Sequence, residues 1–161
     1  MMDGTLFVLT LLSALGCAMM AGGFFAFSTF VMKALARLPA EQGVAAMQAI
    51  NVAAVAFAFM AALLGTAAAY GTLAVWALLA WGERFASYLL VGSALYFVGT
   101  ILLTITCHVP RNEALARVEP RGSGAASHWR RYLSGWTAWN HVRAAASLAA
   151  AATLTIALHV G

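Results

Sequence analysis

Charged side chains are scarce in this sequence, at only 9% of the residues, whereas a typical soluble domain carries roughly 25%. Hydrophobic residues make up 63% of the chain. A water-soluble fold of this size would have to leave broad apolar patches on its surface, which soluble proteins avoid. The composition therefore excludes an ordinary soluble domain and indicates a protein that lies in a lipid bilayer.

Several kinds of catalytic or cross-linking pattern are also missing. The two cysteines, Cys17 and Cys107, are expected at different depths in the membrane, so a disulfide between them is not predicted. The five acidic residues do not pair at a catalytic spacing. The sequence contains no Gly-rich phosphate loop, nucleophile elbow, metal-type cysteine spacing or Glu-x-x-His di-iron motif.

Four long apolar runs are present, approximately at residues 6–32, 52–80, 85–107 and 142–160. About 20 apolar residues in a helix are enough to cross the hydrocarbon core of a bilayer. The first run is too long for a secretory signal and has no basic residue before it, so we interpret it as a permanent span. The sequence predicts an all-α integral membrane four-helix bundle, a single domain over residues 1–161 with a loop at 110–135.

The basic residues predict the orientation of the bundle, because Lys and Arg are retained on the cytoplasmic side. Lys33 and Arg37 follow the first run, and Arg84 alone lies between the second and third. Six further arginines lie between the third run and the start of the fourth: Arg111, Arg117, Arg121, Arg130, Arg131 and Arg143. We therefore expect a multi-pass protein of the inner (cytoplasmic) membrane with both termini outside. The asymmetry accounts for the net charge of +4, so no nucleic-acid partner is predicted.

Proline and glycine residues predict where individual helices bend, end or pack closely. Residues 39–50 are expected to extend the second span into the cytoplasm as one helix. Pro110 either bends the third helix, leaving His108 and Asn112 on one face, or ends it with His108 at the headgroup boundary. Gly65 on the second span and Gly92 and Gly99 on the third are expected to let helices approach closely.

Polar residues at the predicted cytoplasmic ends of the spans form the candidate site. They are Gln48, Asn51, His108, Asn112, Trp136, Trp139, Asn140, His141 and Arg143. At about 100° per helical residue, Asn140 and Arg143 share a quadrant with both tryptophans, whereas His141 projects about 100° away from Asn140. Ionisable groups at membrane depth are costly and usually functional. The alternative interpretation is an interfacial anchor, in which the tryptophans lie at the headgroups and Arg143 snorkels to the cytoplasm.

Four sequence segments together resemble a known family. They are Gly23-Phe-Phe-Ala-Phe-Ser-Thr-Phe-Val-Met32, Met47-Gln-Ala-Ile-Asn51, Val109-Pro-Arg-Asn112 with Leu115, and Trp136-Thr-Ala-Trp-Asn-His-Val-Arg143. In this order and spacing they resemble the anthrone oxygenase-like family of small four-helix membrane proteins. The resemblance covers nearly the whole chain, and the last segment is the most specific.

The resemblance implies oxidation of a lipophilic, polyketide anthrone-like substrate by O₂, with O₂ as co-substrate and no further cofactor. His141 is then the candidate general base, since a neutral imidazole suits proton abstraction near neutral pH. Asn140 and Arg143 would stabilise the enolate oxygen. The expected stacking walls are Trp136, Trp139 and the Phe24 to Phe30 segment, including Phe27. The resemblance supports a site role more strongly for Asn112, Asn140, His141 and Arg143 than for His108.

Two other functions remain open from the sequence. His108 and His141, from different helices, could hold a haem or a redox metal, although two ligands make an incomplete shell for most metals. The bundle could also bind or transport a lipophilic molecule without chemistry, with the polar residues serving for selectivity. The sequence does not determine whether the chain forms a homo-oligomer.

Overall fold

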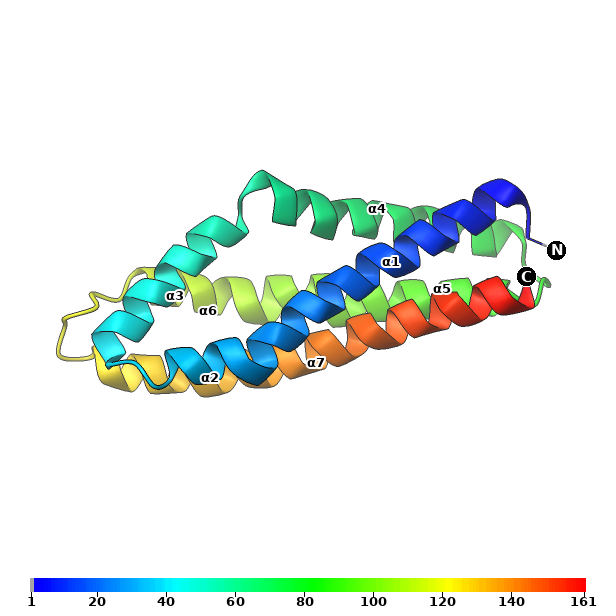
Figure 1. Cartoon of the computed structure of the whole chain (residues 1–161). Coiled ribbons are helices and arrows are strands. Elements are labelled where there is room, and N and C mark those ends of the chain that lie inside the picture. Colours follow the sequence, from blue (N-terminus) through cyan, green and yellow to red (C-terminus); the bar gives the residue numbers. More distant parts are fainter. Residues whose placement is uncertain (1) are drawn as a thin grey trace.

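The computed structural model describes residues 2–161, which are almost entirely helical (Figure 1). The elements in chain order are the α-helices α1 (Gly4–Ala26), α2 (Met32–Leu35), α3 (Ala40–Ala54), α4 (Phe57–Leu79), α5 (Ala86–Tyr96), α6 (Val109–Ala116) and α7 (Ala125–Val160), with the π-helical segments η1 (Phe27–Val31), η2 (Phe97–Leu102) and η3 (Thr104–His108). No β-strand occurs in residues 2–161. The predicted all-α fold is confirmed.

Four helical stretches in the described chain are long and apolar enough to cross a membrane. They run from Gly4 to Leu35, Phe57 to Leu79, Ala86 to Ala116 and Ala125 to Val160. The first and third are composite, because π-helical segments join α1 to α2 and α5 to α6 without a break in the helix. The chain is thus a multi-pass membrane protein, as its composition predicts.

The bundle has an apolar outside and many hydroxyl groups inside. Leu12 and Leu15 on α1 are 60% and 58% exposed, whereas Thr10 and Thr100 are fully buried. The buried hydroxyls bond across helices: Thr100 Oγ1 and Ser147 Oγ lie 2.7 Å apart and join η2 to α7. Such an arrangement suits lipid, where apolar surface costs nothing and each buried polar group needs an internal partner.

The predicted loop at residues 110–135 is mostly helical. Helix α6 continues to Ala116 and α7 already begins at Ala125, so only residues 117–124 lie outside helices. The 36 residues of α7 span about 54 Å at 1.5 Å per residue, far more than the ~30 Å hydrocarbon core. The polar first turns of α7 therefore project beyond the membrane, which a search for apolar runs does not reveal.

Pro110 does not end the third helix. The backbone N–H of Val109 bonds to Thr104 O in the wider π pattern, and Pro110 then occupies the first turn of α6, where its missing N–H is tolerated. The side chain of Arg111 satisfies a carbonyl at this point, since its Nη1 donates to Cys107 O at 2.6 Å. His108 is carried inward instead of lying at a helix end.

The second span differs from the single long helix predicted for residues 39–80. The chain leaves the helical conformation at Val55 and Ala56, and Ala56 is extended with ψ 153°. Figure 1 shows the result, an elbow between α3 and α4 that stands away from α1, α5 and α7. Residues 51–57 contain neither Gly nor Pro, and nothing in the local sequence explains the break.

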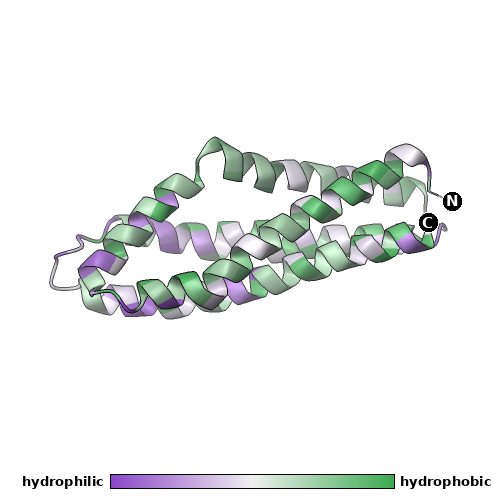
Figure 2. Ribbon diagram, viewed as in Figure 1, coloured by the Kyte–Doolittle hydropathy of each residue, from purple (hydrophilic) through white to green (hydrophobic). Residues whose placement is uncertain are grey.

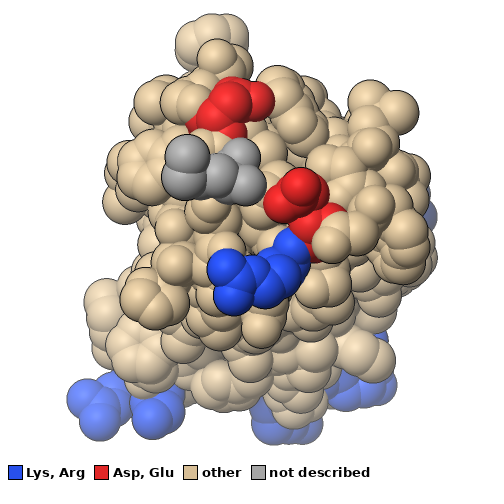
Figure 3. Space-filling view, turned by 90° about the vertical axis from the view of Figure 1, so that its right-hand side faces the viewer, with Lys and Arg blue, Asp and Glu red and all other residues tan. Residues whose placement is uncertain are grey.

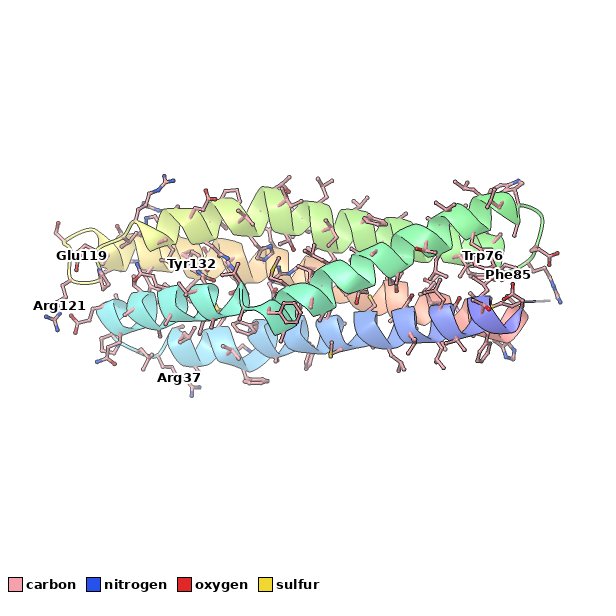
Figure 4. All side chains as sticks on the ribbon, turned by 90° about the horizontal axis from the view of Figure 1, so that it is seen from above. Arg37, Trp76, Phe85, Glu119, Arg121 and Tyr132 are labelled. Atoms are coloured by element: carbon pink, nitrogen blue, oxygen red, sulfur yellow. The ribbon has the colours of Figure 1, made fainter. Side chains whose placement is uncertain are left out.

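The two ends of the bundle differ in polarity. Hydrophilic residues gather at the end that carries the 117–124 loop (Figure 2), and Arg37, Glu119 and Arg121 lie there in Figure 4. Trp76 and Phe85 mark the opposite end, where Figure 3 shows a largely uncharged face with a small charged patch. Both termini lie at this second end (Figure 1). There the backbone N–H of Met2 donates to the carbonyl of Gly161 at 2.8 Å.

Close packing between the third span and α7 depends on a glycine, as predicted for Gly99. A Cβ at Gly99 would overlap the Cβ of Ala146, whereas a Cβ at Gly65 would meet nothing within 4 Å. The expected packing role of Gly65 is therefore wrong. We expect Gly99→Ala to lower the free energy of unfolding by about 1–3 kcal/mol, as overpacking does, while Gly65→Ala has no such cost. Thermal unfolding in detergent measures both, and equal stabilities would contradict the close approach.

Candidate functional site

Arg143 is a buried cation on α7, only 7% exposed. Its Nε and Nη2 donate to Asn140 Oδ1 at 3.2 and 2.6 Å, and its Nη1 donates to Thr104 Oγ1 at 3.1 Å. The guanidinium carbon lies 4.0 Å from the centroid of the Phe24 ring, an interaction that stabilises a cation. No ion pair of Arg143 is present within residues 2–161. Neutral groups alone therefore hold this charge, which is costly at membrane depth.

Asn140 links Arg143 to the first span. Asn140 is fully buried, and its Nδ2 donates to Phe24 O and to Ser28 Oγ, each at 2.7 Å. Its Oδ1 accepts both bonds from Arg143. The amide thus has two donated and two accepted bonds, which is its full capacity. In this arrangement Asn140 has no hydrogen-bonding group left over for the substrate oxygen that it is expected to stabilise.

The π-helical segment η1 positions Ser28 for its contact with Asn140. A π turn interrupts the regular i→i−4 ladder, and such turns are frequent at functional sites. Here it begins three residues after Phe24, whose carbonyl accepts from Asn140. Ser28 is 2% exposed and its oxygen accepts from Asn140, so the hydroxyl hydrogen remains free to donate elsewhere.

A groove of about 460 Å³ runs between α1 and η1 on one side and α7 on the other. It is lined by Ala18, Ala21, Gly22, Phe25, Ser28, Thr29, His141, Ala144, Ala145 and Leu148. Half of these residues are alanine or glycine, and two more are apolar. The α1 and α7 residues at the rim are exposed where lipid would lie. The polar groups on the groove are the His141 ring and the hydroxyls of Ser28 and Thr29, of which Thr29 already donates to Phe25 O at 2.7 Å. His141 and Ser28 are therefore the groups that can act on a ligand here.

A second polar cluster lies inside the bundle around His108. The imidazole is 2% exposed and stands edge-on to the Trp136 ring, with centroids 5.1 Å apart. Neither of its ring nitrogens has a hydrogen-bond partner among the described residues. Beside it, Asn112 Oδ1 accepts from Tyr132 Oη at 2.8 Å and from Trp136 Nε1 at 3.1 Å. Tyr132 lies on the half of the bundle nearer the polar end (Figure 4).

Four other predicted site residues have varied placements. Gln48 Nε2 donates to the carbonyls of Leu115 and Val118, both at 2.9 Å, and so caps the end of α6. Asn51 is half-buried, and its Nδ2 is buried without a partner in the described chain. Phe27 packs on Trp136 at 5.8 Å between centroids. Trp139 is 41% exposed, as an interfacial anchor would be.

The structure thus brings Asn140, Arg143, Phe24 and Trp136 together and separates His141 from them. Arg143 also lies 5.7 Å from the Trp136 ring, so the indole borders both polar clusters. Three contributing residues escaped the sequence prediction, namely Ser28, Thr104 and Tyr132. Ser28 did carry a signal, because it is a hydroxyl residue inside a phenylalanine-rich membrane run.

The two histidines proposed as metal ligands lie in different surroundings. His108 is enclosed against Trp136, whereas His141 is exposed on the lipid-facing groove. Within the described part of the chain, no group of three or more His, Cys, Asp or Glu side chains is arranged to hold a metal ion. The arrangement does not support shared coordination by this pair.

Comparison with known proteins identifies the family. The family model described as anthrone oxygenase matches residues 47–153, which is more than half of the chain and includes both polar clusters except their first-span members. Neither the curated proteins nor the solved structures gave a match. The matched region contains the Asn51, Asn112 and Trp136 to Arg143 segments on which the resemblance rests. This chain belongs to the anthrone oxygenase family.

Proposed function

We propose that the protein is a membrane oxygenase that oxidises a lipophilic aromatic substrate of the anthrone type with O₂ in the groove between α1 and α7. The observation that carries the proposal is the shared groove of His141 and Ser28, with Ser28 joined through Asn140 to the buried Arg143. Family membership supplies the class of reaction.

The size and surface of the groove suit a flat, apolar molecule. Its volume of about 460 Å³ falls in the usual range for small-molecule sites, which are mostly apolar with a few polar groups that fix orientation. The rim residues face the region where lipid would lie, so a lipophilic substrate can enter from the bilayer. Alanines and Gly22 leave room for fused rings, and Phe25 offers an aromatic edge.

His141 is the proposed general base. An anthrone carries an acidic C–H between two aromatic rings and a carbonyl on the opposite edge of the central ring. Removal of that proton gives an enolate whose charge lies largely on the oxygen. His141 comes from α7 and Ser28 from η1, so a substrate lying between them can present its C–H to one and its oxygen to the other.

Ser28 is the proposed donor to the enolate oxygen, and Arg143 strengthens it from a distance. The guanidinium donates to Asn140, which in turn donates to Ser28. Hydrogen bonds in such a chain polarise one another in a low-dielectric interior. A preorganised donor of this kind stabilises the charge that develops in the transition state. Arg143 and Asn140 are thus positioning and polarising residues that do not touch the substrate.

The proposed reaction balances without a further reductant. His141 takes one proton from the methylene carbon, and the resulting carbanion combines with O₂, with uptake of a proton, to give a hydroperoxide. The second C–H proton is then lost as the O–O bond breaks, leaving a carbonyl and releasing water. One oxygen atom of O₂ ends in the product and the other in water, while the carbon is oxidised.

Oxygen uptake by the purified protein in nanodiscs tests the proposal. With an anthrone as substrate, we expect O₂ consumption and quinone formation in equal amounts, well above the rate in protein-free nanodiscs. Binding of the anthrone without excess O₂ uptake would instead support a binding module. If a chelator abolished the activity and added metal restored it, the reaction would depend on a metal ion, and the metal-free route would be wrong.

A matched pair of glycines tests the position of the groove. A Cβ meets nothing within 4 Å at either Gly22 or Gly23, and only Gly22 lines the groove. We expect Gly22→Phe to fill the groove and raise KM by about tenfold or more, the equivalent of ~1.4 kcal/mol of binding. Gly23→Phe should leave KM within about twofold of the wild type, as suits a surface change away from the site. Equal effects of the two substitutions would place the substrate elsewhere.

We also propose that the polar end of the bundle faces the cytoplasm of an inner membrane, because the basic residues gather there. In a variant without the native cysteines, single cysteines would be introduced at positions 2, 84, 123 and 161. A membrane-impermeant thiol reagent applied from outside should label all but position 123. Labelling of position 123 alone would show that the protein has the opposite orientation in the membrane.

A further inference from the structure

His108 and Trp136 have no part in the proposed reaction, yet they lie in a buried cluster that is built from three of the spans. His108 comes from η3, Trp136 and Arg143 come from α7, and Phe24 comes from α1. The Trp136 ring borders both ends of the cluster, with the His108 ring at 5.1 Å and the Arg143 guanidinium at 5.7 Å. His108 and Arg143 therefore both border one indole inside the bundle.

Hydrogen-bond donors outnumber acceptors in this cluster. A guanidinium carries five N–H donors, and three bonds from Arg143 are present, so two hydrogens remain without an acceptor in the described chain. One His108 nitrogen carries a further N–H, and neither ring nitrogen has a partner. The local acceptor Asn112 Oδ1 is already occupied by Tyr132 and Trp136. A ligand that completes the cluster must accept hydrogen bonds.

Charge leads to the same class of ligand. Arg143 is 7% exposed and forms no ion pair among residues 2–161. Phe24 and Trp136 offer aromatic faces to the guanidinium, but such contacts compensate a buried cation only in part. A negative charge beside Arg143 would balance it, and a neutral His108 can donate to the same anion.

We propose that His108 and Arg143, which both border the Trp136 ring, form a binding site for a small anion of the size of a simple carboxylate. The anion accepts from the free Arg143 hydrogens and from the His108 N–H. It is small because Phe24 and Trp136 already pack against the guanidinium and Trp136 against the imidazole. This site is separate from the groove, so its occupancy can be measured with no aromatic substrate present.

Formate is the probe, and nitrogen NMR of histidine-labelled protein in detergent is the readout. At constant pH and ionic strength, we expect formate to shift the His108 ring signals in a saturable way. Gluconate, which is too large for the site, should leave them in place. His128, His141 and His159 lie outside the cluster, and their signals, assigned by single His→Ala variants, should not saturate with formate. The wild-type titration requires no change to the buried site itself.

Substitution of His108 provides the second arm. His108→Phe keeps a ring against Trp136 but removes both nitrogens, and it should weaken formate binding, measured by calorimetry, at least about tenfold. The matched control His159→Phe, at the far end of α7, should bind formate as the wild type does. Unchanged His108 signals in formate would overturn the site, as would equal shifts with gluconate. A ring that is hydrogen-bonded to water alone in every salt would also overturn it.

Discussion

Replacing His141 with alanine is expected to lower turnover of an anthrone about 10²-fold or more while substrate affinity stays nearly unchanged. The reason is that a general base acts mainly in the transition state. His141 lies exposed on the groove, so its removal leaves no buried polar group without a partner. Single-turnover rates of O₂ uptake and binding of a non-reacting quinone would measure the two effects separately.

Two other histidines serve as controls for that experiment. His159 lies near the end of α7 and His128 near its start, and neither lines the groove. Alanine at either position should retain wild-type turnover. Equal losses of binding and turnover in His141→Ala would make His141 a ligand-positioning residue. Loss of a bound chromophore in the same variant would favour a haem or metal.

Removing the Ser28 hydroxyl is the second change with a large expected effect. We expect Ser28→Ala to lower kcat about 10²- to 10³-fold, as loss of one oxyanion donor typically does. KM should change little, because the hydrogen bond to the substrate oxygen strengthens as negative charge develops. Asn140 Nδ2 keeps its bond to Phe24 O in this variant, so the fold should survive, which helical circular dichroism would verify.

A double-mutant cycle decides whether Arg143 acts through Ser28. Arg143→Met removes the charge at similar length, and on its own it should also lower kcat. If the chain from Arg143 through Asn140 to Ser28 works as one unit, the double variant should be scarcely slower than Ser28→Ala alone. Independent, multiplying losses would mean that Arg143 acts on the substrate by another path. Thr104→Val removes the other acceptor of Arg143 but keeps its charge. This variant therefore distinguishes loss of a hydrogen bond to Arg143 from loss of the charge itself.

The large-scale fold follows from composition, because lipid makes length and apolarity nearly sufficient to define a span. The four spans and the helical class are confirmed for that reason. Helix ends were less predictable. Residues 125–135 are polar enough to suggest a loop, but they belong to α7, whose buried Trp129 and Tyr132 pack on neighbouring helices beyond the apolar run. Tertiary packing, which periodicity does not encode, supports that extension.

The membership of the candidate site was only partly predictable. Depth alone places Asn140 and Arg143 with residues of the other spans, and the structure joins them to Phe24. The groove or cluster that each side chain faces could not be derived, because it depends on how each helix is rotated about its own axis. Angular spacing separated His141 from Asn140 correctly, but it gave no indication that His141 would share a groove with Ser28.

Because of the π-helical segments, the site depends on the number of residues in the span that contains each segment. A single π turn within an α-helix corresponds to one additional residue, and the helix beyond it resumes its former register. Deleting one residue within Phe27–Val31 should therefore let Met32 and Leu35 keep their buried positions. If the deleted residue is Phe27, which precedes Ser28, the deletion would also rotate Ser28 away from Asn140. A shortened chain of this kind would insert and fold normally and yet have no continuous path from the buried charge to the groove.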